Sequence, residues 1–225
     1  MGVGGLRSVS LPTDHSIFER HVGDGIEADQ ETRERILLAA ASLFANKGYA
    51  GTAVREIVAA AGVTKPTLYY YFKNKEDLYV QLMDHATETF LQLVDAALAG
   101  PGRVRERMVA LYSNIYAVFR ERLDAVRLVY SMLYGPQGAA PTYDLSKANQ
   151  YLDSVVRQIL QEGVAAGELR DENLEEAVFM LLGMMDSLSC LLVMEPARPP
   201  FSTRDIGRLI DLVFDGARGT LRPRG

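Results

Sequence analysis

The feature that most constrains the fold is a pair of short helical segments separated by a single tight turn. Apolar residues at helical spacing predict helices over residues 53–61 and 65–71, and Gly62 supplies the left-handed conformation that ends the first. Thr52 and Thr64 precede the two segments and are expected to cap them, because a threonine hydroxyl accepts a hydrogen bond from a free amide of the first turn. Two short helices joined in this way cross steeply, as in a helix-turn-helix.

The second of these helices is expected to present most of its side chains to solvent. Leu68 and Phe72 lie four residues apart and face inward, which leaves Lys65, Thr67 and the tyrosines at 69–71. Three consecutive tyrosines cannot all be buried on one face of a helix. Hydroxyl and ammonium groups at a helix N-terminus suit phosphate oxygens and the edges of bases. The segment therefore predicts a recognition helix for double-stranded DNA.

The remainder of the chain also follows a helical period, with glycine and proline at the breaks. No alternating run of β-branched residues predicts a strand, so we expect an all-α fold of about nine helices. Three units are expected: a flexible arm over 1–28, a three-helix helix-turn-helix domain over 29–76, and a larger helical domain over 77–225. Outside the central pair, the predicted helices cover residues 28–48, 75–99, 103–120, 124–134, 142–167, 171–194 and 203–219.

The net charge of −5 at neutral pH is unevenly distributed along the chain. Residues 30–76 carry seven basic and four acidic side chains, a net charge of +3, so the rest of the chain carries −8. One basic segment on an acidic body can direct a single face toward a polyanion. A random scatter of surface charges would also produce such a division fairly often, so the asymmetry supports DNA binding only together with the recognition helix.

No catalytic or metal-binding pattern accompanies these helices. His15, His21 and His85 are scattered, and the sequence lacks the H-E-x-x-H, G-x-S-x-G and phosphate-loop motifs. The single Cys190 excludes an intrachain disulfide and fits a reducing interior. With no stretch of about 18 uncharged apolar residues and no secretory signal, we expect a cytoplasmic protein without a membrane segment. We expect no cofactor and no metal; an enzyme, or a ligand-binding adaptor whose DNA-binding face has decayed, are the alternative interpretations.

Residues 32 to about 82 resemble the DNA-binding domain of TetR/AcrR-type transcriptional regulators. The similarity is carried in register by R-x-x-I-L-x-A-A-x-x-L-F, K-G-Y-x-G-T, V-R-E-I-V and A-G-V-T-K-P-T-L-Y-Y-Y-F-K-N-K-E-D-L. It covers about a quarter of the chain closely, and the remainder is similar only in its helical architecture. The resemblance implies a ligand-responsive regulator that binds operator DNA, most simply a repressor that a small molecule releases.

The resemblance also implies which residues contact DNA. Thr52, Tyr69 and Lys75 match phosphate contacts, Arg55 lies where a guanine is reached, and residues 65–67 and 70 lie where bases or thymine methyl groups are read. The full set is Thr52, Arg55, Thr64, Lys65, Pro66, Thr67, Tyr69, Tyr70 and Lys75. Simpler interpretations remain for some of them: the two threonines only cap helices, Arg55 pairs with Glu56 or Glu34, and the neighbouring Tyr71 stacks on the first helix.

In the resemblance, residues 77–225 hold a cavity for a small-molecule effector of unknown identity. Methionine and tyrosine form an adaptable apolar lining, although packing in a helical core explains each of them as well. The candidates are Met108, Tyr112, Tyr116, Phe119, Tyr130, Met132, Tyr134, Met184 and Asp186. Asp186 needs a partner within so apolar a segment. It contacts a dimer partner, binds a cationic ligand or accepts a hydrogen bond from a tyrosine.

The last two helices are expected to mediate dimerisation. Residues 174–194 are apolar nearly all round, which indicates a helix packed on more than one side. In the resemblance, this helix and the final one form a four-helix interface with their copies in a twofold homodimer, where Gly183 allows close approach. The expected interface residues are Leu181, Leu188, Leu192, Ile206, Leu209, Ile210, Val213 and Phe214. Packing only within the core of one monomer is the other interpretation.

Overall fold

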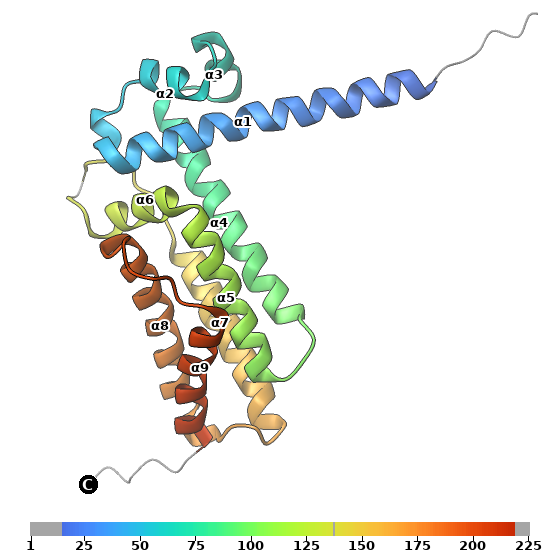
Figure 1. Cartoon of the computed structure of the whole chain (residues 1–225), viewed down its shortest axis with the longest axis vertical. Helices are drawn as coiled ribbons and strands as arrows, with labels where there is room; N and C mark the ends of the chain where they lie inside the picture. The colour runs from blue at the N-terminus through green and yellow to red at the C-terminus, as the bar shows by residue number, and fades with distance from the viewer. Residues whose placement is uncertain (1–14, 137, 219–225) are drawn as a thin grey trace, which may run out of the picture.

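The computed structural model describes residues 15–136 and 138–218, and every regular element in these ranges is helical (Figure 1). The predicted all-α fold is confirmed, since the described residues form nine α-helices and one 3-10 turn, η1 (Asp171–Asn173). The α-helices are α1 (His15–Gly51), α2 (Val54–Ala61), α3 (Lys65–Tyr71), α4 (Lys75–Ala99), α5 (Val104–Glu121), α6 (Leu123–Tyr134), α7 (Ser146–Ala165), α8 (Leu174–Met194) and α9 (Thr203–Arg218).

Helix α1 begins earlier than the sequence predicts. Residues 15–28, expected to form part of an arm without helical structure, belong to α1, while residues 1–14 of that arm lie outside the described residues. The prediction is wrong for 15–28 because Gly23 and Gly25 each lower helix propensity by only about 1 kcal/mol. Extending an existing helix adds one hydrogen bond per residue, which offsets this cost. At the other end, Gly48 has φ 75° and interrupts the helix, as predicted.

Helices α1 to α4 enclose a first hydrophobic core, which we call the helix-turn-helix core. Among its buried side chains are Ile36, Phe44, Ile57, Leu68 and Phe72. This core continues past residue 76, where the sequence placed a domain boundary, into the first half of α4 and to one buried residue of α6. The additional members are Leu78, Tyr79, Leu82, Met83 and Leu128. The first half of α4 therefore packs as part of the helix-turn-helix unit.

A second core lies in the bundle formed by α5, α7, α8, α9 and the second half of α4. Helix α5 contacts each of the other four helices, and its Met108 and Tyr112 are fully buried there. Leu181 of α8 and Phe214 of α9 are buried in the same core. Because α4 contributes to both cores, a continuous helix of 25 residues joins the two parts of the molecule (Figure 1).

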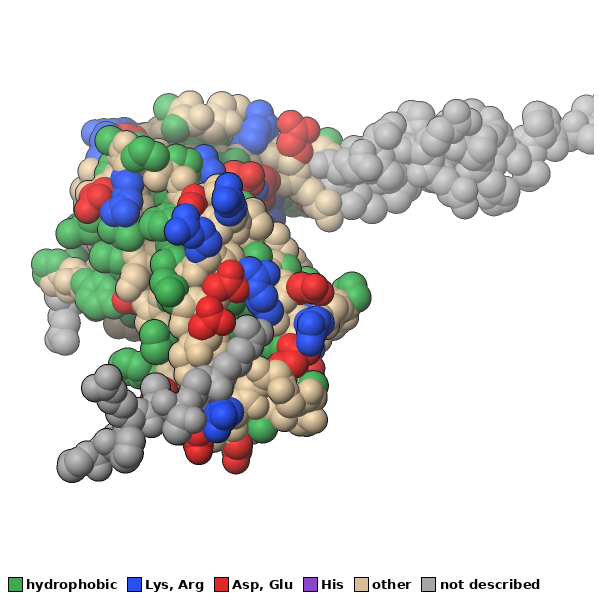
Figure 2. All heavy atoms as spheres, turned by 60° about the horizontal axis from the view of Figure 1, so that its bottom comes forward, with side chains coloured by type: hydrophobic (Ala, Val, Ile, Leu, Met, Phe, Trp, Pro, Cys, Tyr) green, Lys and Arg blue, Asp and Glu red, His purple; other side chains and the backbone are tan. Residues whose placement is uncertain are grey.

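Helix α8 is apolar on more sides than the bundle covers. The segment Asp171–Met194 is long and apolar enough to cross a membrane by length and composition, yet it packs against α5, α6, α7 and α9, and 33% of its apolar window is buried. Phe179, Met180 and Met194 remain exposed. Figure 2 shows hydrophobic side chains more frequent on the left of the molecule, where α8 lies in Figure 1, and alternating charges toward the right. The exposed side of α8 is therefore available to a second packing partner.

Candidate DNA-binding surface and effector cavity

Helix α3 is fixed by its cap and by two buried side chains. The Thr64 hydroxyl accepts a hydrogen bond from the Thr67 amide (3.3 Å), which confirms the predicted cap. Pro66 lies in the first turn, where its missing amide hydrogen costs no helical hydrogen bond. Leu68 and Phe72 have no exposed surface. The orientation of the outer face of α3 is therefore set by the helix-turn-helix core.

The outer face of α3 offers polar and aromatic groups to solvent. Tyr69 is 48% exposed and Tyr70 is 75% exposed. Tyr71 instead turns toward α1, where its hydroxyl donates a hydrogen bond to Asp29 Oδ1 (2.6 Å), in line with the expected contact to the first helix. The other predicted residues of this helix are placed similarly: exposed Lys65 and Pro66, and half-buried Thr67.

Thr52 does not cap α2, so that prediction is wrong. Its side chain is nearly buried (2% exposed), and its hydroxyl donates to carbonyl oxygens at the end of α1, that of Gly48 at 2.9 Å and that of Leu43 at 3.2 Å. The cap position is Ala53, whose amide donates to the Glu56 carboxylate (2.8 Å). A glutamate in the first turn can supply the acceptor that the cap residue lacks. Thr52 therefore ties α2 to α1.

The Lys75 ammonium also turns toward the protein. It donates hydrogen bonds to the carbonyl oxygens of Tyr49 (2.8 Å) and Thr52 (3.0 Å), and it lies 4.1 Å from the centroid of the Tyr49 ring. One of these carbonyl groups lies in the last turn of α1 and the other just after it, where the helix supplies no amide donor of its own for every acceptor, so the lysine holds the end of α1 and the start of the next turn together. An ammonium has three donors, and two are engaged here. The predicted phosphate contact would depend on the third.

Arg55 keeps its exposed position on α2. The two carboxylates considered as its partners are engaged elsewhere: Glu56 lies 2.6 Å from Lys47 Nζ, and Glu34 lies 2.7 Å from Arg122 Nη1. The hydrogen bond from Lys47 lowers the pKa of Glu56. Arg55 therefore presents its guanidinium group to solvent on the helix that precedes α3.

Replacing Lys65 by methionine is expected to weaken DNA binding alone, whereas Lys75→Met should also destabilise the fold. Loss of one exposed positive charge from the predicted DNA-binding face reduces the slope of log affinity against log salt by up to about 1. Lys75→Met leaves two carbonyl oxygens without a charged donor, a loss of roughly 1.5–3 kcal/mol. Fluorescence anisotropy at several salt concentrations and thermal melting separate the two effects. Equal melting temperatures for the two variants would contradict the role assigned to Lys75.

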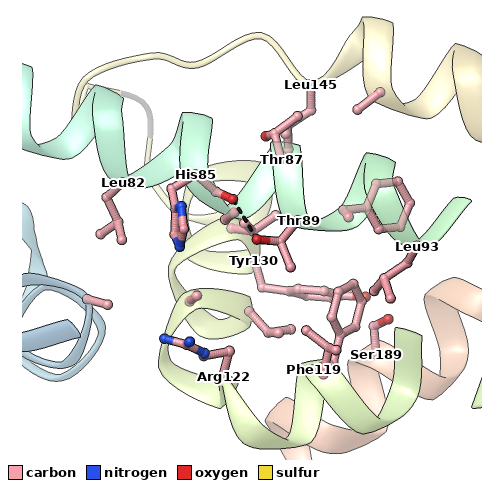
Figure 3. Close-up of a pocket in the computed structure, with 18 of the residues that line it drawn as sticks. Leu82, His85, Thr87, Thr89, Leu93, Phe119, Arg122, Tyr130, Leu145 and Ser189 are labelled. Atoms are coloured by element: carbon pink, nitrogen blue, oxygen red, sulfur yellow. Dashed lines mark hydrogen bonds between the residues drawn. The ribbon is translucent and has the colours of Figure 1, made fainter. Parts of the chain in front are cut away.

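A cavity of about 440 Å³ lies between α1 and the bundle, with walls from α1, α4, α5, α6, α7 and α8. Figure 3 shows how it is lined: His85 and Arg122 lie at the end next to α1, while Leu93, Phe119 and Ser189 lie at the other end. Most lining side chains are aliphatic or aromatic. Such an enclosure suits a small molecule with a large apolar part.

Three of the predicted pocket residues line this cavity, namely Phe119, Tyr130 and Asp186. The remaining candidates do not line it. On α5, the predicted residues at 108, 112 and 116 lie four apart and form one stripe directed into the bundle core, whereas only the last turn of α5 reaches the cavity. The candidates that do not line the cavity are buried Met108, Tyr112 and Tyr116, half-buried Met132 and Met184, and exposed Tyr134.

Of the three interpretations of Asp186, the structure supports the one in which it accepts a hydrogen bond from a tyrosine. The Tyr130 hydroxyl lies 2.8 Å from Asp186 Oδ1 and donates a hydrogen bond to it. Burial of the ring, together with this hydrogen bond, raises the pKa of Tyr130. The phenol therefore stays protonated at neutral pH and keeps the Asp186 carboxylate engaged on the wall of the cavity.

A second polar group lies at the α1 end of the cavity. Arg122, at the junction of α5 and α6, donates to Glu34 Oε1 of α1 (2.7 Å), and His85 Nε2 of α4 lies 3.4 Å from Glu34 Oε2. These three residues come from distant parts of the chain, and no sequence motif indicated that they would meet. They connect the first helix of the DNA-binding unit to the cavity wall.

Most residues predicted for the dimer interface are buried within a single chain. Leu181, Leu188, Ile206, Ile210, Val213 and Phe214 belong to the bundle core, and Leu192 and Leu209 are half-buried against it. Helical spacing identified apolar positions but could not tell the inner face from the outer one. The large exposed apolar residues on these helices are Phe179 (78%), Met180 (52%), Met194 (73%) and Leu212 (70%), and the backbone of Gly183 faces open space.

Comparison with known proteins agrees with this architecture. Residues 36–82 match the family model "Bacterial regulatory proteins, tetR family", and residues 101–189 match "Tetracyclin repressor-like, C-terminal domain". The HTH-type transcriptional repressor NicS of Pseudomonas putida is 28% identical over 153 residues, which cover 66% of this chain and 71% of that protein.

Two solved structures share the fold. The TetR-family regulator PfmR of Thermus thermophilus has a TM-score of 0.65 and 23% identity over 84% of this chain and 100% of its own. The regulator FadR of Bacillus subtilis, in complex with stearoyl-CoA, has a TM-score of 0.60 and 23% identity over 84% of this chain and 99% of its own. With both its helix-turn-helix and its C-terminal bundle matched, the chain belongs to the TetR family of DNA-binding transcriptional regulators, whose members are not enzymes.

Proposed function

We propose that the protein acts in the cytoplasm as a homodimeric repressor, in which residues 29–76 with the first half of α4 bind operator DNA and the bundle binds an effector. The observation that carries this proposal is the exposed face of α3 above a fully buried base. Tyr69, Tyr70 and Lys65 project from a helix whose Leu68 and Phe72 have no exposed surface. A short helix anchored in this way can enter a major groove without rearrangement.

The proposed DNA contacts divide into two groups. The exposed residues and the half-buried Thr67 are proposed to contact DNA directly: Arg55 and Lys65 at guanine or phosphate, Pro66 and Tyr70 at thymine methyl groups or bases, and Thr64, Thr67 and Tyr69 at the backbone. Thr52 and Lys75 are proposed to act mainly by joining α1, α2 and α4, because their polar groups bond to carbonyl oxygens of α1 and of the turn after it.

The proposed dimer uses the outer faces of α8 and α9. Phe179, Met180 and Leu212 provide large exposed apolar side chains, and Gly183 permits close approach of a second helix. Helix α9 is held on α5 by the ion pair of Arg105 with Asp211, which fixes the face that α9 presents. A twofold pair of such chains would place two α3 helices in successive major grooves, about 34–36 Å apart.

The proposed effector is a molecule with a long acyl chain. Supporting this is the cavity of about 440 Å³, whose lining is mostly aliphatic and aromatic. The Bacillus subtilis structure of the same fold was solved with stearoyl-CoA. An effector that favours a conformer with a different separation of the α3 helices would weaken operator binding by its differential affinity for the two conformers.

A mobility-shift assay with the region upstream of the protein's own gene tests this function. We expect a shift that requires Tyr70 and that an acyl-CoA diminishes, with a coupling of about 5–150-fold in affinity. The control variant is Tyr134→Phe, at an exposed aromatic residue on α6. Failure to bind that region or any other genomic fragment would favour the adaptor interpretation instead.

A further inference from the structure

The cavity has one cationic group, and that group is already occupied by a carboxylate of the protein. Arg122 is the only arginine or lysine among the cavity-lining residues in the described part of the chain. Its Nη1 donates to Glu34 Oε1 at 2.7 Å, and His85 Nε2 approaches the other carboxylate oxygen at 3.4 Å. The other carboxylate on the wall, Asp186, is engaged by the Tyr130 hydroxyl.

The pair of Arg122 and Glu34 is suited to exchange. The two side chains are 45% and 33% exposed, and an ion pair with this access to water is weak. Glu34 approaches from α1, whereas Arg122 is held by the backbone where α5 meets α6, its amide donating to the Val118 carbonyl (2.9 Å). The arginine can therefore change its carboxylate partner without moving its own helices, and the partner that it gives up belongs to the DNA-binding unit.

We propose that the effector carries an anionic head group that takes Arg122 from Glu34, so that its binding breaks the charged link between α1 and the α5–α6 junction. This inference rests on the proposed function in using the cavity as the effector site. An amphiphile would bind with its head at Arg122 and its chain along the apolar walls toward Leu93 and Phe119, the end away from α1 in Figure 3. The Asp186 carboxylate disfavours the opposite orientation, because like charges repel.

The same exchange explains how a ligand could be sensed by the DNA-binding unit. Glu34, Leu37, Leu38 and Ala41 of α1 form one wall of the cavity, so the effector would contact this unit directly. Removing the Glu34 contact takes away a charged link between α1 and the α5–α6 junction, while apolar packing keeps α1 on α2, α4 and α6. Affinity for the anion and coupling to DNA should thus depend on Arg122 and Glu34 in different ways.

Binding of dodecanoate and dodecanol to the full-length protein, measured by calorimetry below micellar concentrations, tests the head-group preference. The wild-type protein should bind the anion about tenfold or more tightly than the alcohol, the ratio that one charge-assisted hydrogen bond supplies. Arg122→Met should remove this preference but still bind dodecanol, and this retained binding also reports that the variant is folded. Arg127→Met is the matched control, because Arg127 lies on α6, pairs with Asp124 and does not line the cavity.

The Glu34→Gln variant tests whether Glu34 competes with the ligand for Arg122, because it removes the carboxylate charge and keeps nearly the same side-chain shape. Dodecanoate should bind this variant several-fold more tightly, yet its effect on operator affinity should fall at least fivefold, since the contact that the ligand breaks is already weakened. Dodecanoyl-CoA distinguishes two sources of the anion. If only the thioester binds in an Arg122-dependent manner, then the head group is a phosphate of CoA rather than a carboxylate.

The outcomes separate this inference from the proposed function. The exchange of partners would be overturned if neither dodecanoate nor dodecanoyl-CoA bound, or if neither bound more tightly than dodecanol. It would also be overturned if the preference for the anion survived Arg122→Met, or if Glu34→Gln bound the preferred anion more weakly. Release of DNA by dodecanol and dodecanoate alike would support the effector-released repressor and overturn the exchange. Conversely, an Arg122-dependent preference without any release of DNA would leave the exchange standing and remove the proposed repressor mechanism.

Discussion

Replacing Leu212 by aspartate is expected to convert the proposed dimer into monomers and to weaken operator binding by on the order of 100-fold or more. Leu212 is 70% exposed on α9, so within one chain it has little apolar contact to lose. In the proposed dimer, the carboxylate of the introduced aspartate would be buried in an apolar interface without a partner, which is strongly unfavourable. Operator affinity falls because two linked half-site contacts become independent.

Size-exclusion chromatography with light scattering, together with anisotropy on a palindromic operator, measures the two effects of Leu212→Asp. Tyr134→Asp is the control, because Tyr134 is also 70% exposed but lies on α6. The melting temperature of the monomer should fall with dilution less than that of the wild-type dimer, since only the dimer gains stability by mass action. A Leu212→Asp protein that remains dimeric would show that α9 does not form the interface.

Phe72→Ala is expected to lower the free energy of unfolding of the helix-turn-helix core by about 3–5 kcal/mol. The Phe72 ring has no exposed surface and packs beneath α3 among the residues of α1 and α4. Its truncation leaves a cavity that the neighbouring side chains cannot fill completely, and α3 loses one of its two anchors. Urea unfolding followed by tyrosine fluorescence measures the loss, and operator binding should disappear with it.

Tyr70→Ala is the counterpart of that variant on the outer side of the same helix. At 75% exposure, Tyr70 should contribute only about 0.5 kcal/mol or less to folding, while its loss still weakens DNA binding. The two variants therefore distinguish a residue that supports the recognition helix from one that is proposed to contact DNA. If Phe72→Ala unfolds at the wild-type urea concentration, then the ring is not the anchor that the structure indicates.

The sequence predicts those parts of the molecule whose determinants are local. The cap at Thr64, the end of α2 at Gly62 and the inward pair Leu68 and Phe72 each depend on residues within one or two turns, and the structure confirms them. Thr52 was assigned a cap because its residue type fits that role. Its actual acceptors lie on α1, and which carbonyls lie within reach depends on how the helices pack.

The residues that line the cavity and the residues on the outer face of α8 are still harder to predict from the sequence, because both depend on how distant helices pack. Glu34 and Arg122 are 88 residues apart in the sequence, and nothing in either local pattern indicates that they meet. For α8, the sequence shows apolar residues on nearly every side, so the inward position of Leu181 and the exposed position of Phe179 follow only from the placement of α5, α7 and α9. A helical period identifies a stripe but does not say what covers it.

The position of Leu128 has a consequence for how the protein can be divided. This side chain belongs to the second domain expected from the sequence, but it is 3% exposed within the helix-turn-helix core, which also contains Leu82 and Met83 of α4. A fragment that stopped at residue 76 would leave an uncovered apolar surface where these three side chains belong, so it would tend to unfold or aggregate. The helix-turn-helix unit therefore depends on side chains from α4 and α6 for its core. A C-terminal bundle taken from another regulator would have to supply apolar side chains at the same positions.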